Sequence, residues 1–275
     1  MIVVVVEKFT KHAAALASFL AVDFTLAGHV IINRPLLEGP AALANTHEIF
    51  GLSVNSLVLI WAIAAFLTYR WFVTGRKNVA TISWSVGFWL YGILFLAFVL
   101  QALGTPGVDM NVPTTFFLFR QTMILWVALL YFGLAKLLFT NRAWILVPTA
   151  VFVAAGYGIF TWGLILLGDI ERTMYAFLFL ELIPICVIDG YLFMLYGNRA
   201  GIRSTAYLGA GFFGIAATYA AWAPWHLTFF YLVWFFLFQL SLVPLLIGFL
   251  LLSKDLAIRE LEKALEVARV AAGDA

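Results

Sequence analysis

The sequence predicts an all-α protein, a polytopic membrane bundle of eight transmembrane helices with both termini in the cytoplasm and a short amphipathic helix at the C-terminal end. Composition is the first reason, because 64% of the 275 residues are apolar, 11% are charged and the mean hydropathy is +1.03. Soluble domains carry about 25% charged residues. The second reason is length, since most apolar runs exceed the roughly 20 residues with which an α-helix crosses a bilayer. No alternating strand pattern competes with them.

Apolar runs bounded by charge, proline or glycine define the spans in chain order. The eight predicted spans are residues 11–33, 48–69, 79–104, 114–139, 143–168, 172–197, 203–222 and 226–252. The N-terminal residues lack the features of a cleaved signal peptide, so we expect them to remain in the mature protein. The predicted organisation is a transmembrane domain of residues 1–253 and a cytoplasmic helix of residues 254–275, in which apolar side chains recur at helical spacing.

The cations test this order of spans, because eight spans place both termini on one side of the membrane. Arg34, Arg120 and Arg172 fall on the opposite side. The remaining thirteen fall on the side of the termini: Lys8, Lys11, Arg70, Arg76, Lys77, Lys136, Arg142, Arg199, Arg203, Lys254, Arg259, Lys263 and Arg269. Cations concentrate on the cytoplasmic side of membrane proteins. We therefore expect a multi-pass protein of the cell membrane with cytoplasmic termini and short outer connections.

Ionisable residues inside spans are costly, so each is a functional candidate. At 1.5 Å per residue, Arg120, Glu181 and Asp23 share one layer at depths of about 9, 13 and 15 Å from the outer end. Asn55 lies at a similar depth, whereas Asp189 is expected near the cytoplasmic end, in contact with interfacial water. The outer layer is interpreted either as a buried ion pair that fixes helix register or as a polar cavity that opens outward.

Proline and glycine add local expectations. Pro184 has no amide hydrogen and follows Glu181 by three residues, which predicts a kink beside the acid. Gly209, Gly211 and Gly214 of the seventh span are expected to let helices approach closely. The single cysteine, Cys186, excludes an intrachain disulfide and a thiolate metal site.

Three of the four histidines fall at the outer ends of spans: His29 ends the first, His47 opens the second and His226 opens the eighth, directly after Trp225. Imidazoles in this position can hydrogen-bond a quinone carbonyl and take its proton, ligate haem iron or a transition metal, or act as a pH switch. Placement at the rim favours quinone over haem, because ligands of a transmembrane haem b usually come from facing helices at matching depth.

Three segments, SWSVGFW at 83–89, YFGLA at 131–135 and AWILVPTAVF at 143–152, are similar to patterns of the NrfD-type membrane anchors of polysulfide reductases and related respiratory complexes. Of the acidic-Leu-Gly-Arg-Pro turn that this family carries after its second helix, the chain has Gly75 and Arg76. The resemblance implies quinol or quinone chemistry in an outward-opening pocket, an Fe–S partner subunit and no haem in the anchor. His29 would correspond by location to the pocket histidine of the family.

The leading hypothesis is a membrane subunit of a respiratory electron-transfer complex that binds quinone, with other protein subunits as partners. His29 is the proposed hydrogen-bond partner of the quinone and its proton acceptor, and the proposed proton path or charge support consists of Asp23, Glu181 and Arg120. The proposed pocket residues are His29, His47, His226, Trp225 and Asn55. One alternative is a b-type cytochrome or metal-binding protein that uses His47 with His29 or His226. Another is an ion or small-solute transporter with its site around Glu181. Cations dispersed over loops exclude a nucleic-acid partner.

Overall fold

The computed structural model describes residues 46–74, 78–225 and 230–273, and every regular element in these ranges is a helix. Two short elements, η2 and η3, are π-helical. In chain order the elements are α2 (Thr46–Val73), α3 (Val79–Ala102), α4 (Pro113–Leu138), α5 (Ala143–Phe160), η2 (Thr161–Leu166), α6 (Ile170–Phe177), η3 (Leu178–Leu182), α7 (Ile183–Ala200), α8 (Thr205–Trp225) and α9 (Phe230–Gly273).

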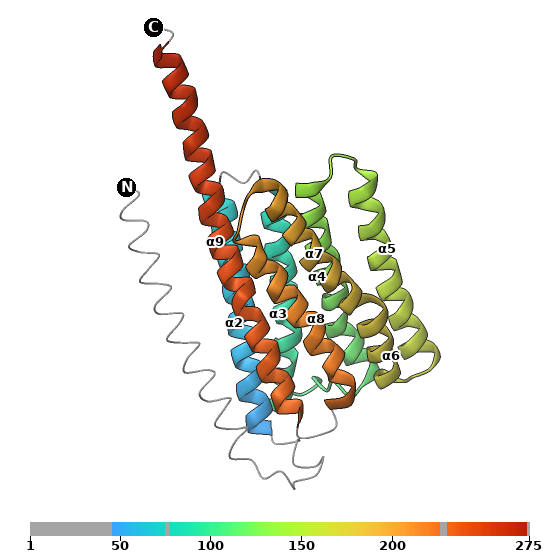
Figure 1. Cartoon of the computed structure of the whole chain (residues 1–275). Coiled ribbons are helices and arrows are strands. Elements are labelled where there is room, and N and C mark those ends of the chain that lie inside the picture. The colour runs from blue at the N-terminus through green and yellow to red at the C-terminus, as the bar shows by residue number, and fades with distance from the viewer. Residues whose placement is uncertain (1–45, 75–77, 226–229, 274–275) are drawn as a thin grey trace.

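Six helices close a ring in the order α2, α3, α4, α7, α8 and α9, because each contacts the next and α9 contacts α2. The helix α5 lies outside this ring against α4, and α6 joins it to α7 at the end of the bundle opposite the C-terminus (Figure 1). Buried aromatic and aliphatic side chains fill the middle of the ring. Residues far apart in the sequence, on α3, α4, α7 and α8, therefore meet in one core.

Six stretches of the described residues are long and apolar enough to cross a membrane. They are Phe50–Val73, Val79–Ala102, Pro113–Leu138, Ala143–Leu166, Thr173–Ala200 and Val233–Ile258. Each overlaps one predicted span, and α8 occupies the place of the seventh. The first predicted span, residues 11–33, lies outside the described residues. The chain is thus an all-α, multi-pass membrane protein as predicted, while the total of eight spans and the side of the termini remain predictions.

At several glycines a side chain of the neighbouring helix, in two cases a tryptophan ring, fills the space that a Cβ would occupy. A Cβ on Gly133 of α4 would lie 2.4 Å from Trp84 Nε1, and that indole donates to the carbonyl of Leu130 at 3.1 Å. Gly92 of α3 receives the indole of Trp61 in the same way. The predicted packing role of the α8 glycines is confirmed: a Cβ would lie 2.8 Å from Met194 Cγ at Gly209, 2.5 Å from Leu245 Cγ at Gly211 and 2.7 Å from Ser241 Oγ at Gly214. Between helices in lipid there is no hydrophobic driving force, so association depends on van der Waals packing, and small residues allow the helices to pack closely.

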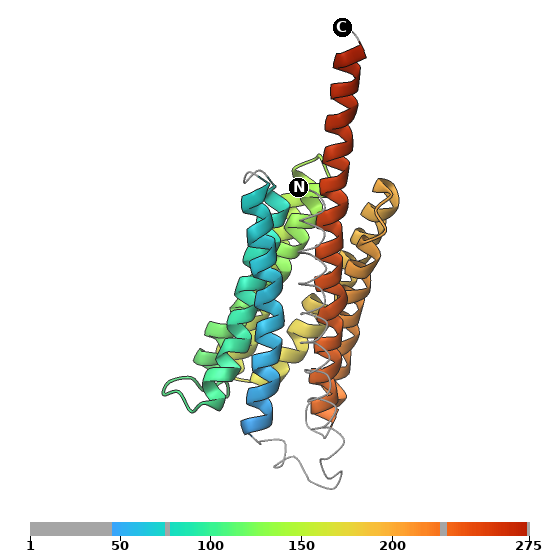
Figure 2. The same cartoon turned by 90° about the vertical axis from the view of Figure 1, so that its left-hand side faces the viewer.

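The predicted cytoplasmic helix is the end of α9 rather than a separate element. Its 44 residues run from Phe230 to Gly273 without a break, and the last turns project from the bundle along the same axis (Figures 1 and 2). Two contacts hold α9 where it leaves the ring: Ser204 Oγ donates to Asp255 Oδ2 at 2.6 Å, and Arg70 Nη2 donates to the carbonyl of Ser253 at 3.3 Å.

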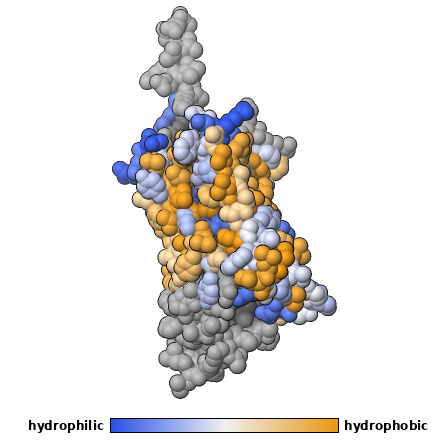
Figure 3. Space-filling model, turned by 90° about the vertical axis from the view of Figure 1, so that its right-hand side faces the viewer, coloured by the Kyte–Doolittle hydropathy of each residue, from blue (hydrophilic) through white to orange (hydrophobic). Residues whose placement is uncertain are grey.

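The surface over α5 is strongly apolar. Trp144, Val147, Ile165 and Leu166 are between 58% and 72% exposed. Figure 3 shows hydrophobic side chains across the middle of this face, with hydrophilic ones near both of its ends. Lipid is the solvent that such a face requires, so these side chains are assigned to contact with acyl chains.

Candidate functional site

Pro184 shapes the helix that carries Glu181. Without an amide hydrogen, Pro184 cannot continue the α-helical ladder to the carbonyl of Leu180. The preceding residues, Leu178–Leu182, form the π-helical turn η3, in which the amide of Ile183 bonds to the carbonyl of Leu178, five residues back. A wide turn therefore lies beside the acid, whereas the kink expected at Pro184 stays a prediction. Turns of this kind inside helices occur frequently at functional sites.

Glu181 is 2% exposed and packs against the backbone of α5. A Cβ on Gly156 would lie 2.8 and 2.9 Å from its two carboxyl oxygens and 2.6 Å from Ile124 Cγ2 of α4. Neither oxygen of Glu181 has a hydrogen-bond partner among the described residues. Glu181 therefore accepts no hydrogen bond from Arg120, and the other pair that the sequence allows, Arg120 with Asp23, lies outside the described residues.

Asp189 lies in the core of the bundle rather than at the interface. The expectation that it reaches interfacial water is wrong, because the side chain is 1% exposed. The helix α7 continues to Ala200, beyond the predicted end of the span, and α8 approaches closely at Gly190, where a Cβ would lie 3.2 Å from the carbonyl of Gly209. Within the described ranges, neither carboxyl oxygen of Asp189 has a hydrogen-bond partner.

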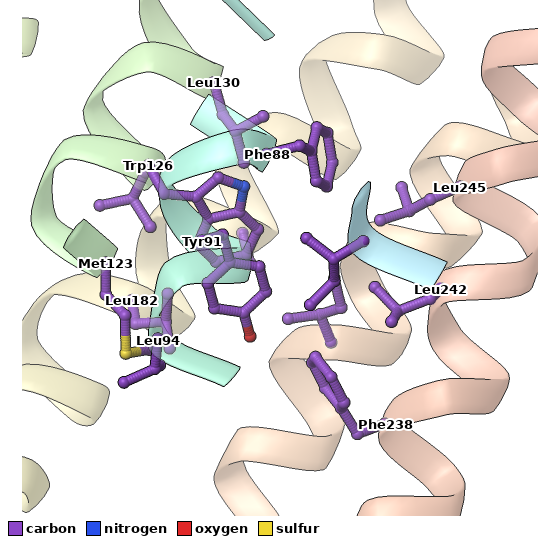
Figure 4. Packing of buried hydrophobic residues seen from close by; sticks show 14 of the residues in the cluster. Phe88, Tyr91, Leu94, Met123, Trp126, Leu130, Leu182, Phe238, Leu242 and Leu245 are labelled. Carbon is purple, nitrogen blue, oxygen red and sulfur yellow. The ribbon is translucent and has the colours of Figure 1, made fainter. Parts of the chain in front are cut away.

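Two tyrosine hydroxyls form a buried polar contact at the middle of the ring. Tyr91 of α3 and Tyr219 of α8 are hydrogen-bonded through their hydroxyl groups. The ring of Tyr91 stacks on Trp126 of α4, with centroids 3.9 Å apart and planes at 4°. Figure 4 shows these two rings face to face, with Phe238 of α9 on the other side of the core. Cys186 is buried on α7, three residues before Asp189.

Arg120 is buried beside the tyrosine pair. Its guanidinium lies over the rings of Phe98 and Phe116, at 5.3 and 5.2 Å from their centroids, and Nη1 donates to Met123 Sδ at 3.2 Å. A cavity of about 20 Å³ separates it from Tyr219. The other walls of this cavity are Leu94, Phe95, Phe98, Met174, Trp234 and Phe235. A cavity of this volume has room for one water molecule.

The structure describes part of the predicted site. Arg120 and Glu181 are both buried inside the bundle, where an ionisable side chain avoids contact with lipid. Asn55 is half-buried on α2. Asp23, His29 and His226 lie outside the described residues, as do the side chains of His47 and Trp225 at helix ends. Convergence of the three histidines therefore remains a prediction.

Sequence reasoning missed several buried polar groups. Gln239 is 0% exposed, and its Nε2 donates to the carbonyl of Leu52 at 3.1 Å and to Ser56 Oγ at 3.3 Å. Its Oε1 has no hydrogen-bond partner in the described part of the chain. Gln239 could have been identified as a buried polar group, because it is a lone amide in the apolar run around 229–243. Nothing in the sequence indicates that Tyr91 pairs with Tyr219.

No group of three or more His, Cys, Asp or Glu side chains is placed to hold a metal ion within the described ranges. Comparisons with protein-family models, with curated proteins and with solved structures found no match. The site must therefore be interpreted from its own chemistry.

Proposed function

We propose that the protein binds protons inside the membrane and moves them across it, with Glu181 and Asp189 as the proton-binding groups. The observation that supports this is the burial of both carboxyls, whose four oxygens have no hydrogen-bond partner among the described residues. A carboxyl in such a place requires a proton or a compensating cation. The Gly156 backbone and an Ile124 methyl border Glu181, and this apolar setting differs from the oxygen cage of a metal ion.

A proton path needs groups between the two carboxyls, which are about 12 Å apart along η3 and α7 at 1.5 Å per residue. The buried Cys186 lies between them in sequence, on α7. The Tyr91–Tyr219 contact and the cavity beside Arg120 extend this polar region across the ring. Hydroxyl groups and a bound water can relay protons at such sites.

Proton flux into liposomes that contain the purified protein and an internal pH dye tests the proposal. Glu181→Gln is isosteric and cannot release a proton, so we expect flux to fall by at least about tenfold. Glu262→Gln, the same change at an exposed position of α9, should leave flux unchanged. Wild-type flux from Glu181→Gln would refute the role of this carboxyl.

Quinone binding in a respiratory subunit is the second candidate, and the aromatic cavity beside Arg120 favours it. A guanidinium, the Tyr219 hydroxyl and the ring of Trp234 around one cavity are suited to the carbonyls and the flat ring of a quinone headgroup. The cavity is smaller than a headgroup, so binding would require Phe98 or Met174 to move. Quenching of tryptophan fluorescence by a short-chain quinone should weaken in Arg120→Gln and His29→Ala, and an unquenched wild type would remove this candidate.

Haem b or a transition metal held by His47 with His29 or His226 remains a sequence prediction. An absorption spectrum and elemental analysis of the purified protein decide it. Protein partners are likewise proposed, and copurification from the native membrane would identify them.

A further inference from the structure

A groove of about 510 Å³ opens at the end of the bundle from which α9 projects. Four helices line it: α2 near its C-terminus, α3 at its N-terminus, α4 in its last turn and α9 where it leaves the ring. Its volume lies within the range of sites that bind small molecules, about 300–1,000 Å³. The tyrosine pair, Glu181 and Asp189 are absent from its lining, so the groove is separate from the proposed proton site.

Two cations stand in the wall of the groove, on different helices. Arg70 of α2 is half-buried and donates one hydrogen bond to the carbonyl of Ser253, which fixes the guanidinium against α9. Lys136 of α4 is exposed, with Nζ 5.7 Å from the ring of Phe132. Asn78, the N-cap of α3, also lines the groove. The dipole of α3 is offset by the C-terminal ends of α2 and α4, so the positive charge of the groove comes from its two cations.

Its other walls are apolar. The half-buried Phe66, Leu137 and Leu256 and the exposed Val79 line the groove. A soluble anion would leave these side chains uncovered, whereas a lipid covers them with acyl chain and brings its phosphate to the cations. Basic pockets between transmembrane helices bind anionic lipid headgroups in this way.

We propose that this groove binds one anionic phospholipid, with the phosphate between Arg70 and Lys136 and an acyl chain along the half-buried Phe66 of α2. The charge of the whole end is complementary to such a lipid. Six described cations lie there. Arg70, Lys136, Arg142, Arg199 and Arg203 are at helix ends or in the adjoining turns, and Lys254 is on α9 where it leaves the ring. These cations attract anionic lipids in the adjoining membrane surface. The groove supplies the place where one of these lipids is held.

Native mass spectrometry of the full chain, titrated with phosphatidylglycerol or with phosphatidylcholine, tests the proposal. Phosphatidylglycerol should bind more tightly. Arg70→Gln with Lys136→Gln should weaken it by about 30-fold, and Lys136→Gln alone by about fivefold, from the energy that each basic residue contributes at an anionic surface. Lys136 is exposed, so the single variant is expected to fold even where the double variant does not.

The matched control is Arg142→Gln with Arg199→Gln, which removes the same charge from the same end outside the groove and should leave the affinity unchanged. Equal affinity for the two lipids would overturn the proposal, as would an equal loss in the control. Displacement of phosphatidylglycerol by millimolar inorganic phosphate would also overturn it, because the site would then belong to a soluble anion.

Discussion

The spans formed by α5 with η2 and by α6, η3 and α7 share two features, a proline and a π-helical turn, but they lie in different surroundings. Pro148 and η2 belong to a span at the edge of the bundle, where Ile165 and Leu166 are 71% and 72% exposed. Pro184 and η3 belong to a span that contributes to the closed ring and buries Glu181 and Asp189. A distorted helix alone does not mark a site. The proposed site depends on the two buried carboxyls of the second span, which the first span lacks.

The π turn of the α5 span has a structural explanation. A Cβ on Gly163 would lie 1.9 Å from Thr173 Oγ1, and the carbonyl of Gly163 accepts from the amide of Asp169. Gly168, with φ of 64°, then reverses the chain. Thus η2 brings the end of one span against the start of the next. No corresponding turn follows η3, which is continuous with α7.

The largest expected effect comes from neutralising both acids. Glu181→Gln with Asp189→Asn should reduce proton flux in liposomes to the level of protein-free vesicles, because no carboxyl then remains on α7 in the core. Thr161→Val, a polar-to-apolar change in the exposed π turn of the α5 span, should leave flux unchanged. If the double variant conducted normally, the functional distinction between the two spans would be lost.

Next in size is the cost of removing aliphatic side chains from the two spans. Ile185→Ala on α7, where the side chain is 1% exposed, should lower stability by about 2–5 kcal/mol through loss of packing. Ile165→Ala on η2, at 71% exposure, should change it by less than about 0.5 kcal/mol. Thermal unfolding in detergent measures both. Similar losses would mean that a partner or a second copy covers η2.

Two glycines on α5 give a closer comparison. Gly156→Ala places a methyl group against the Glu181 carboxyl, so we expect a cost of about 1–3 kcal/mol from overpacking together with reduced proton flux. A Cβ on Gly158 meets nothing within 4 Å, and Gly158→Ala should stabilise the helix by up to about 1 kcal/mol. Unaltered flux in Gly156→Ala would show that this contact does not position the acid.

The smallest effect concerns the tyrosine pair. Tyr91→Phe or Tyr219→Phe should each cost about 1–2 kcal/mol, since the remaining hydroxyl loses its partner in the core. The double variant should cost less than the sum, with a coupling of about 1 kcal/mol in a double-mutant cycle. Tyr69→Phe, at a side chain that is 63% exposed, is the control. Additive losses would contradict a direct hydroxyl contact.

Helix positions were predictable because the bilayer fixes the length of an apolar run and charge marks its ends. The fourth span illustrates this, with residues 114–139 predicted and Pro113–Leu138 observed. The continuity of α9 was missed, since hydropathy shows where the apolar run ends but not whether the helix continues beyond it.

Position within a span was also predictable, since Glu181 and Arg120 both lie in stretches long and apolar enough to cross a membrane. Lateral arrangement was not, because it depends on which helices become neighbours. Tyr91 and Tyr219 are 128 residues apart, and a single sequence carries no signal that α3 faces α8 at this level. Asp189 was misplaced for a related reason: its burial depends on the close approach of α7 and α8 at Gly190.

Infrared difference spectroscopy of the protonated carboxyl C=O stretch tests the central claim most directly, because it detects the proposed bound protons. Wild-type protein should show two such bands that shift in D2O, one lost in Glu181→Gln and the other in Asp189→Asn, with both retained in Glu262→Gln. If neither substitution removed a band, Glu181 and Asp189 would not hold protons in the membrane, and the proposed function would be wrong.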